Sequence, residues 1–334
     1  MTPNPRLLEA RFQAAHDDLA ALREALEQTI VGQKRMITEL LTAVFAGGHV
    51  LLEGLPGLGK THLAKALSGA MGFELARVQC TPDLMPADVT GSEVLLSDGQ
   101  GRQQIDFRRG PIFASMVLVD EINRATPKTQ AALLEAMQEA QVTHAGVQHP
   151  LPHPFWVLAT QNPIEIEGTY PLPEAQLDRF MCRIDVAYPD ADSLLQIVEL
   201  ALDDEPANHM PPILGPQRVE ELMGIVREVV IARSLKQAAV ELILATHPDR
   251  EQGRTLAARH FRYGASPRGL QALLRAARVK ALLDGRVHLD LDDLAQVALP
   301  VLRHRILLRV ESELEGVEVD GLLSGILEQW RQRH

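Results

Sequence analysis

The segment from Gly54 to Thr61 has the spacing of a phosphate-binding loop, with four residues between Gly54 and the run Gly59-Lys60-Thr61. The apolar residues before it predict a buried strand over 49–53, and a helix is expected after it. Glycines let the backbone approach phosphate oxygens, and the N–H groups at a helix start favour anions. In this motif the lysine reaches the β- and γ-phosphates of a nucleoside triphosphate, and the hydroxyl ligates Mg²⁺. The residues predicted to bind the nucleotide here are Gly54, Pro56, Gly57, Leu58, Gly59, Lys60, Thr61 and His62.

A second candidate is the acidic pair Asp120-Glu121, which ends the apolar run 116–119. Apolar runs that end in acidic residues are common, but this one follows a phosphate loop at the distance typical of a Walker B strand. The buried strand would deliver both carboxylates to the edge of the sheet where such folds bind their ligand. We expect Asp120 to hold Mg²⁺ through water, and Glu121 to orient the water that attacks the γ-phosphate.

Three further polar residues are candidates on weaker grounds. Asn162 follows the apolar strand 155–159, where an amide could hydrogen-bond the γ-phosphate or the attacking water; an ordinary turn asparagine fits equally well. Arg268 follows Ser266-Pro267, a helix start at which an isolated cation is unfavourable and a bound anion would relieve the conflict. For Arg268 and for Arg179 the residues alone also fit surface ion pairs.

Composition narrows the functional classes. The net charge of −11 argues against a protein that coats nucleic acid, although it does not exclude a local basic channel. Only 4% of the residues are aromatic, so the core must be aliphatic. Two cysteines without a CxxC spacing fit reduced thiols, and without a membrane-length apolar run or a secretory leader we expect a cytoplasmic protein. Three of the twelve histidines, His144, His149 and His153, cluster without metal-ligand spacing, so we expect a solvated hairpin.

Strands that alternate with helices predict a parallel α/β sheet. The expected strands are 49–53, 73–80, 116–119, 155–159 and 182–186, and the expected helices are 6–28, 33–45, 60–71, 126–140 and 172–180. The pattern changes near residue 188, after which every segment reads as helix. We therefore place an α/β domain over 1–188 and an all-helical domain over 189–334. Two polar, turn-rich segments, 81–110 and 141–154, are expected to project from the first domain.

With these residues laid out, the chain resembles the MoxR family of AAA+ ATPases over nearly its whole length. The resemblance rests on the two nucleotide motifs, on 160–163, on the run Gly-Thr-Tyr-Pro-Leu-Pro-Glu-Ala-Gln-Leu-Asp-Arg-Phe at 168–180, and on 264–268. It implies that Asn162 is sensor 1, Arg179 an arginine finger for the neighbouring subunit, and Arg268 sensor 2. It also implies that 30–33, including Val31 and Gly32, lies over the adenine, that 81–110 is a helix-2 insert, and that 141–154 is a pre-sensor-1 hairpin. Gly269, where the family often has alanine, is a minor departure.

The resemblance further implies an AAA+ P-loop ATPase with a five-stranded parallel sheet and an all-helical lid. Such proteins use ATP and Mg²⁺ and form rings, often hexameric. Several mature or insert metals into client enzymes, together with a partner that carries a von Willebrand factor type A domain. A nucleic-acid motor on the same core is the main alternative, and the acidic charge disfavours it. A nucleotide switch without turnover is a third class, and the presence of Glu121, Arg179 and Arg268 argues against it.

Overall fold

A computed structural model describes residues 5–97, 103–165, 168–202, 211–248 and 255–334 of the chain. Its centre is one five-stranded sheet in the order β2-β5-β8-β1-β9, in which every neighbouring pair is parallel. The strands are β1 (His49–Glu53), β2 (Leu75–Gln79), β5 (Met116–Asp120), β8 (Trp156–Gln161) and β9 (Phe180–Asp185). The predicted parallel α/β sheet is confirmed. Strand β9 begins two residues earlier than expected, because Phe180 pairs with His49.

Both faces of the sheet are covered, as near-continuous apolar strands require. Alternate residues of one strand enter different cores: Val50 and Leu52 join the larger cluster, and Leu51 joins the smaller one. The first face lies against α1 (Pro5–Thr29), α2 (Lys34–Phe45) and α3 (Lys60–Ala70). The second lies against α5 (Pro127–Glu139) and the short helices α4 (Pro86–Thr90), η1 (Pro111–Phe113) and η2 (Ile122–Arg124). A four-residue helix, α6 (Glu174–Leu177), precedes β9, where a longer helix was expected.

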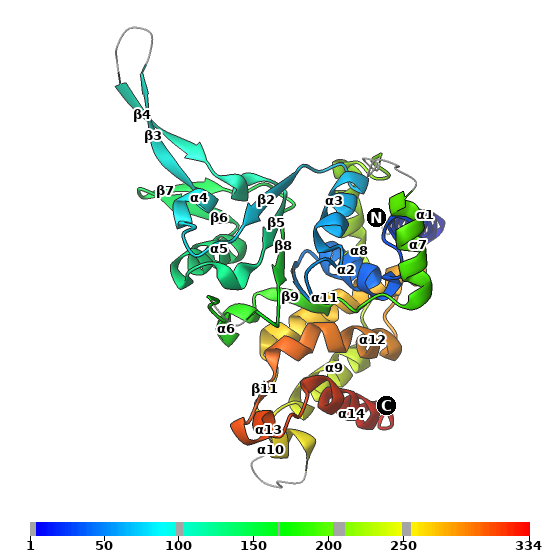
Figure 1. Cartoon of the computed structure of the whole chain (residues 1–334). Coiled ribbons are helices and arrows are strands. Elements are labelled where there is room, and N and C mark those ends of the chain that lie inside the picture. Colours follow the sequence, from blue (N-terminus) through cyan, green and yellow to red (C-terminus); the bar gives the residue numbers. More distant parts are fainter. Residues whose placement is uncertain (1–4, 98–102, 166–167, 203–210, 249–254) are drawn as a thin grey trace.

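The C-terminal part is helical; its first two helices lie to the right of the sheet in Figure 1, and most of the others lie below it. Its helices are α7 (Ala191–Leu202), α8 (Pro216–Glu228), α9 (Arg233–Ala245), α10 (Leu256–His260), α11 (Pro267–Leu283), α12 (Leu291–Leu302), η3 (Arg303–Arg305), α13 (Val310–Leu314) and α14 (Val319–Arg331). The structure adds an antiparallel pair, β10 (Phe261–Tyr263) and β11 (Leu307–Leu308), which is too short to show a strand period in sequence. The larger core runs from the sheet into these helices, and the domain boundary near 188 stays a prediction. None of the described helices is long and apolar enough to cross a membrane.

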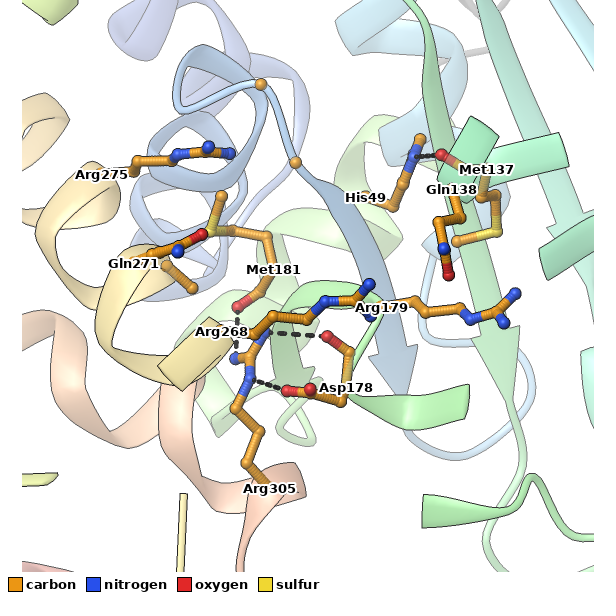
Figure 2. A pocket seen from close by; sticks show the side chains of 13 residues that line it. His49, Met137, Gln138, Asp178, Arg179, Met181, Arg268, Gln271, Arg275 and Arg305 are labelled. Carbon is orange, nitrogen blue, oxygen red and sulfur yellow. Dashed lines mark hydrogen bonds and ion pairs between the residues drawn. The ribbon is translucent and has the colours of Figure 1, made fainter. Parts of the chain in front are cut away.

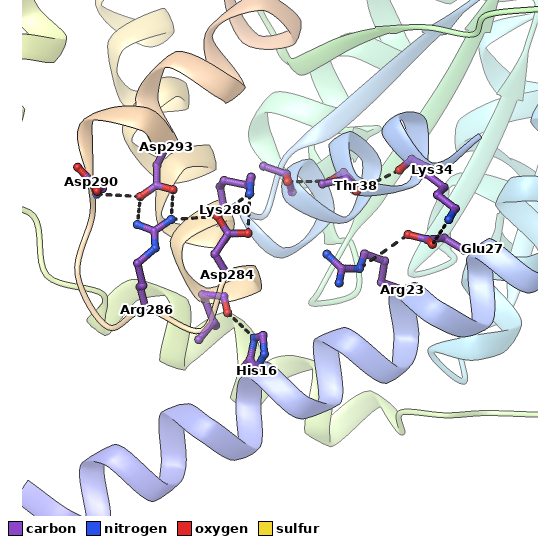
Figure 3. A network of polar contacts seen from close by, with 12 residues as sticks. His16, Arg23, Glu27, Lys34, Thr38, Lys280, Asp284, Arg286, Asp290 and Asp293 are labelled. Carbon is purple, nitrogen blue, oxygen red and sulfur yellow. Dashed lines mark hydrogen bonds and ion pairs between the residues drawn. The ribbon is translucent and has the colours of Figure 1, made fainter. Parts of the chain in front are cut away.

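A buried ion pair fixes the turn between α11 and α12 (Figure 3). The Arg286 guanidinium donates two hydrogen bonds to the fully buried carboxylate of Asp293, at 2.6 and 2.5 Å. Asp293 also accepts the backbone N–H of Asp290, which caps the start of α12. Hydrogen bonding to Asp293 raises the pKa of Arg286, so the pair stays charged. The turn therefore has one geometry, and α11 and α12 pack side by side.

The two predicted projections are both hairpins. Strands β3 (Gly91–Ser97) and β4 (Gln103–Arg109) pair antiparallel and extend well away from the body, and β6 (Gln141–His144) pairs with β7 (Val147–Pro150) at their base (Figure 1). Ala145 and Gly146 both have positive φ, as a two-residue hairpin turn requires. The expected segment 81–110 also contains the short helix α4.

The histidines of the second hairpin are not simply solvated, which corrects our expectation. The Phe107 ring stacks on His149 at 4.3 Å and on His144 at 5.1 Å between centroids, so the two hairpins are packed together. Sequence could not show this contact, because Phe107 lies more than thirty positions away in the other insert. Among the residues that the structure describes, no group of three potential metal ligands occurs, and His153 is exposed.

We predict that the hairpin tip is dispensable for folding. Replacing residues 143–148 by Asn-Gly should change the melting temperature by no more than about 3 °C, because the removed side chains are mostly exposed. Val142→Ala, next to the tip but buried, should instead cost on the order of 1–2 kcal/mol. Thermal unfolding followed by circular dichroism measures both. A large loss of melting temperature in the shortened chain would mean that the tip belongs to the core.

Candidate functional site

The phosphate loop joins the end of β1 to the start of α3 and has the backbone that its glycines predict. Gly57 and Gly59 have φ of 81° and 77°, and no atom lies within 4 Å of a Cβ added at either position. Gly54 is required for another reason, because a Cβ there would lie 3.0 Å from the Val186 carbonyl oxygen. Gly59 also stands at the N-cap of α3 without a side-chain cap, so the first N–H groups of the helix are available to an anion. The loop is therefore an open cradle that fits phosphate groups.

Lys60 lies inside this cradle. Its Nζ donates a hydrogen bond to the Gly54 carbonyl oxygen at 2.6 Å. Burial lowers the pKa of Lys60, and the nearby carboxylates of Asp120 and Glu121 act in the opposite direction. Thr61 is half-buried in the first turn of the same helix. The hydroxyl of Thr61 and the carboxylate of Asp120 are the hard oxygen donors that Mg²⁺ prefers, so the side chains present fit that ion.

The two acidic residues are fixed by neighbours on both sides of β5. The Asp120 carboxylate is buried; it accepts a hydrogen bond from Arg77 Nε at 2.7 Å and one from the Thr160 hydroxyl at 3.3 Å. Glu121 has a left-handed backbone, with φ 56° and ψ 52°, and its N–H donates to the same hydroxyl at 2.9 Å. A non-glycine residue in this region carries strain of order 1–3 kcal/mol. The Glu121 carboxylate lies 3.1 Å from Arg124 Nε.

Sequence reasoning missed Arg77, Thr160 and Arg124. Arg77 lies two positions before Gln79, which pairs with Asp120, and Thr160 is the last residue but one of the other neighbouring strand. Which strands flank β5 depends on the sheet order, which no local pattern gives. The polar residues that end β8 were the one available signal for Thr160.

Asn162 lies at the same edge, one residue beyond β8, and is buried. Its side-chain oxygen accepts the backbone N–H of Ile164 at 3.2 Å, which is the turn contact that sequence left as an alternative. The segment 30–33 reaches this edge as well. Gln33 donates to the Ala187 carbonyl oxygen at 2.9 Å, and a Cβ on Gly32 would lie 2.3 Å from the Ser193 hydroxyl oxygen. Val31 and Gly32 are thus held beside the end of β9, next to the phosphate loop.

Arg179 and Arg268 lie elsewhere. Both line a cavity of about 320 Å³ with Gly47 and Gly48, which precede β1, whereas the phosphate loop follows β1 (Figure 2). A five-residue strand spans roughly 16 Å, so neither side chain can reach its own phosphate loop. Among the described residues, neither arginine has an ion-pair partner. The predicted site residues therefore form two groups, at opposite edges of the sheet.

The cavity also contains a histidine that sequence did not single out. His49 Nδ1 accepts the Val157 N–H at 3.0 Å, so Nε2 carries the proton that it shares with the Met137 carbonyl oxygen at 3.1 Å. Burial lowers the pKa of His49 to about 4. A second proton would face the Val157 N–H, so the ring is neutral at neutral pH and adds no charge beside the arginines.

Comparison with known families agrees with this arrangement. Residues 49–182, which cover the sheet from β1 into β9, match the family described as "ATPase family associated with various cellular activities (AAA)". Residues 253–323 match the AAA lid domain.

Individual relatives match over most of their length. The chain is 36% identical to "Chaperone MoxR1" of Mycobacterium tuberculosis, over 91% of this chain and 79% of that protein, and 34% identical to "Protein MoxR" of Paracoccus denitrificans, over 85% and 87%. It is 39% identical to protein YeaC of Bacillus subtilis, over 93% and 94%. A crystal structure from Cytophaga hutchinsonii, provisionally named an ATPase, superposes with a TM-score of 0.88 at 38% identity and covers 97% of each chain.

We predict that His49 makes stability depend on pH. Its pKa is about 6.5 in the unfolded chain and about 4 in the folded one, so the unfolded chain binds more protons between these values. Stability should fall as pH drops from 6.5 towards 4, by on the order of 1–2 kcal/mol at pH 5 relative to pH 7.5. Urea unfolding of the wild type and of His49→Gln should show that the substitution removes this part of the pH dependence.

The exposed His288 provides the control. His288→Gln should keep the wild-type pH dependence, and His304, which is buried and has a lowered pKa, contributes equally to all three proteins. A pH dependence that is the same with and without His49 would contradict the prediction.

Proposed function

Because the chain belongs to the MoxR family of AAA+ ATPases, we propose that it hydrolyses ATP in a ring of identical subunits and uses that energy to remodel or mature a protein client. The observation that carries the proposal is the separation of its charged residues. A loop that fits phosphates lies at the carboxyl edge of the sheet, and two unpaired arginines lie at the amino edge. One subunit cannot bring the two groups together. Copies arranged head to tail can, and such contacts close into rings.

In the first half of the site, residues of one subunit would bind the nucleotide and orient the attacking water. The loop N–H groups and Lys60 would hold the β- and γ-phosphates, with Val31 and Gly32 beside the adenine. Mg²⁺, held by Thr61 and Asp120, would offset phosphate charge. Glu121 would orient the attacking water, since the Thr160 hydroxyl holds its backbone at the carboxyl edge of the sheet. Asn162 would hydrogen-bond the water or the γ-phosphate with its amide nitrogen, because its oxygen is used in the turn.

The second half would come from the next subunit. Arg179 and Arg268 line one cavity, and neither has a carboxylate partner within the described part of a chain whose net charge is −11. Two guanidinium groups that remain unpaired in an acidic protein fit an anion that arrives from outside the chain. An arginine supplied in this way stabilises the charge that develops on the transferred phosphoryl group, and is worth roughly 10³–10⁵ in turnover.

The client is the least determined part of the proposal. Relatives named as chaperones support a protein client. The two hairpins, which stand away from the sheet and are packed together through Phe107, are the surfaces that would contact it. A hexameric ring, a partner with a von Willebrand factor type A domain and metal-cofactor insertion remain predictions from the family resemblance.

We predict that Glu121→Gln separates binding from chemistry. The amide keeps the shape of the side chain but loses the charge that orients water, so ATP should bind with wild-type affinity while hydrolysis falls by on the order of 10²-fold or more. Equilibrium binding of a fluorescent ATP analogue and phosphate release measure the two steps. Lys60→Ala is the contrasting variant and should lose binding itself. Equal loss of binding and hydrolysis in Glu121→Gln would show a structural role instead.

We also predict that Arg179 acts on the neighbouring subunit. Arg179→Ala should bind ATP and hydrolyse it poorly, and mixing it with Glu121→Gln protein should restore activity. In mixed rings roughly a quarter of the interfaces would combine an intact Glu121 with an intact Arg179 of the next subunit. Phosphate release from the mixture tests this, with light scattering to show that mixed rings form. Two inactive variants that stay inactive in mixed rings would rule out action in trans.

A further inference from the structure

Asp178 contacts residues next to both of the cavity arginines Arg179 and Arg268. It immediately precedes Arg179, and its carboxylate accepts a hydrogen bond from Arg305 Nε at 2.7 Å. The same carboxylate accepts the hydroxyl of Ser266, with O···O distances of 3.0 and 3.2 Å. Ser266 is the N-cap of α11 and lies two residues before Arg268. A single carboxylate therefore joins the chain segment of one arginine to the helix start of the other (Figure 2).

Arg305 extends this contact to the backbone on both sides of Arg179. Its side chain is only 3% exposed. One terminal nitrogen donates to the carbonyl oxygens of Phe180 at 2.6 Å and Asp178 at 3.3 Å, and the other donates to that of Met181 at 3.1 Å and to that of Val301. The planar guanidinium thus satisfies peptide groups from 178 to 181 at once, which an ammonium group could not do.

The same contacts use the one carboxylate that lines the cavity among the described residues. Asp178 lines it together with Arg179 and Arg268, and Arg305 and Ser266 occupy its oxygens. A buried ion pair adds little net stability, because desolvation offsets the attraction, so stability alone is a weak reason to keep one here.

We propose that Asp178, Ser266 and Arg305 are positioning residues that set Arg179 of the α/β part and Arg268 of the helical part as one unit. Both guanidinium groups then reach the phosphates of the next subunit together. This rests on the proposed action in trans. The positioning contacts would also prevent the start of α11 and the segment before β9 from moving independently. A shift of the helical part would then move both arginines.

The test measures hydrolysis and binding in Asp178→Asn and Ser266→Ala. Each variant keeps its own phosphate loop, so each should bind the fluorescent ATP analogue as the wild type does. Hydrolysis in assembled rings should fall by on the order of 10²-fold in Asp178→Asn, as expected for displaced catalytic groups, and by less in Ser266→Ala. Ser266→Thr retains the hydroxyl and should retain activity. Asp293→Asn breaks an ion pair of the helical part whose carboxylate is fully buried, away from the cavity, and should leave the hydrolysis rate unchanged.

Mixing two variant proteins distinguishes a positioning role of Asp178 from a general loss of structure. Asp178→Asn mixed with Glu121→Gln should regain activity to the extent that Arg179→Ala mixed with Glu121→Gln does, because the defect lies only in what is offered to the neighbour. If Arg179→Ala is rescued and Asp178→Asn is not, positioning in trans is wrong while the proposed function stands. If neither is rescued, the proposed function fails first. Should Asp178→Asn not fold, the Ser266→Ala and Ser266→Thr pair decides: equal activities would overturn the inference.

Discussion

The polarity of the parallel sheet is the constraint on which the site depends. All five strands run the same way, so every segment that follows a strand meets at one edge and every segment that precedes one meets at the other. The phosphate loop, Asp120, Glu121 and Asn162 follow strands and share the first edge. Arg179 precedes β9, and the helical part brings Arg268 to that second edge. One subunit therefore holds the two groups of predicted site residues at opposite edges, and the proposed action in trans would join them through a neighbour in the same orientation.

The helices, the strands and the phosphate-binding part of the site could be predicted from sequence because each depends on local signals. Glycines at fixed spacing set the loop, and uninterrupted apolar runs mark strands that are buried on both faces. The structure also accounts for two predicted glycines in different ways: Gly59 by its positive φ, and Gly54 by the close approach of Val186. The resemblance to a family gave the roles of Arg179 and Arg268, for which the residues alone left a surface ion pair as an alternative.

Contacts between segments that are far apart in the chain could not be predicted from sequence. Thr160 touches both acidic residues only because β8 neighbours β5, and Phe107 stacks on His144 and His149 only because two inserts lie together. Arg305 is the clearest example: it lies more than one hundred and twenty positions from Asp178, in a segment whose local pattern shows nothing but basic residues. In each case the missing information is the sheet order or the packing of the helical part, neither of which is encoded in a short window.

The same long-range contacts decide which of the described arginines form an ion pair. Arg286 and Arg303 each contact a carboxylate, whereas Arg179 and Arg268, like Arg275 in the same cavity, do not. At the amino edge the nearby carboxylate is occupied by a buried arginine, and the nearby histidine is held neutral by two backbone groups. Among the described residues that line the cavity, Arg179, Arg268 and Arg275 form no ion pair, so the cavity is positively charged. A positively charged cavity at this edge is the charge pattern that the proposed action on a neighbour's phosphates requires.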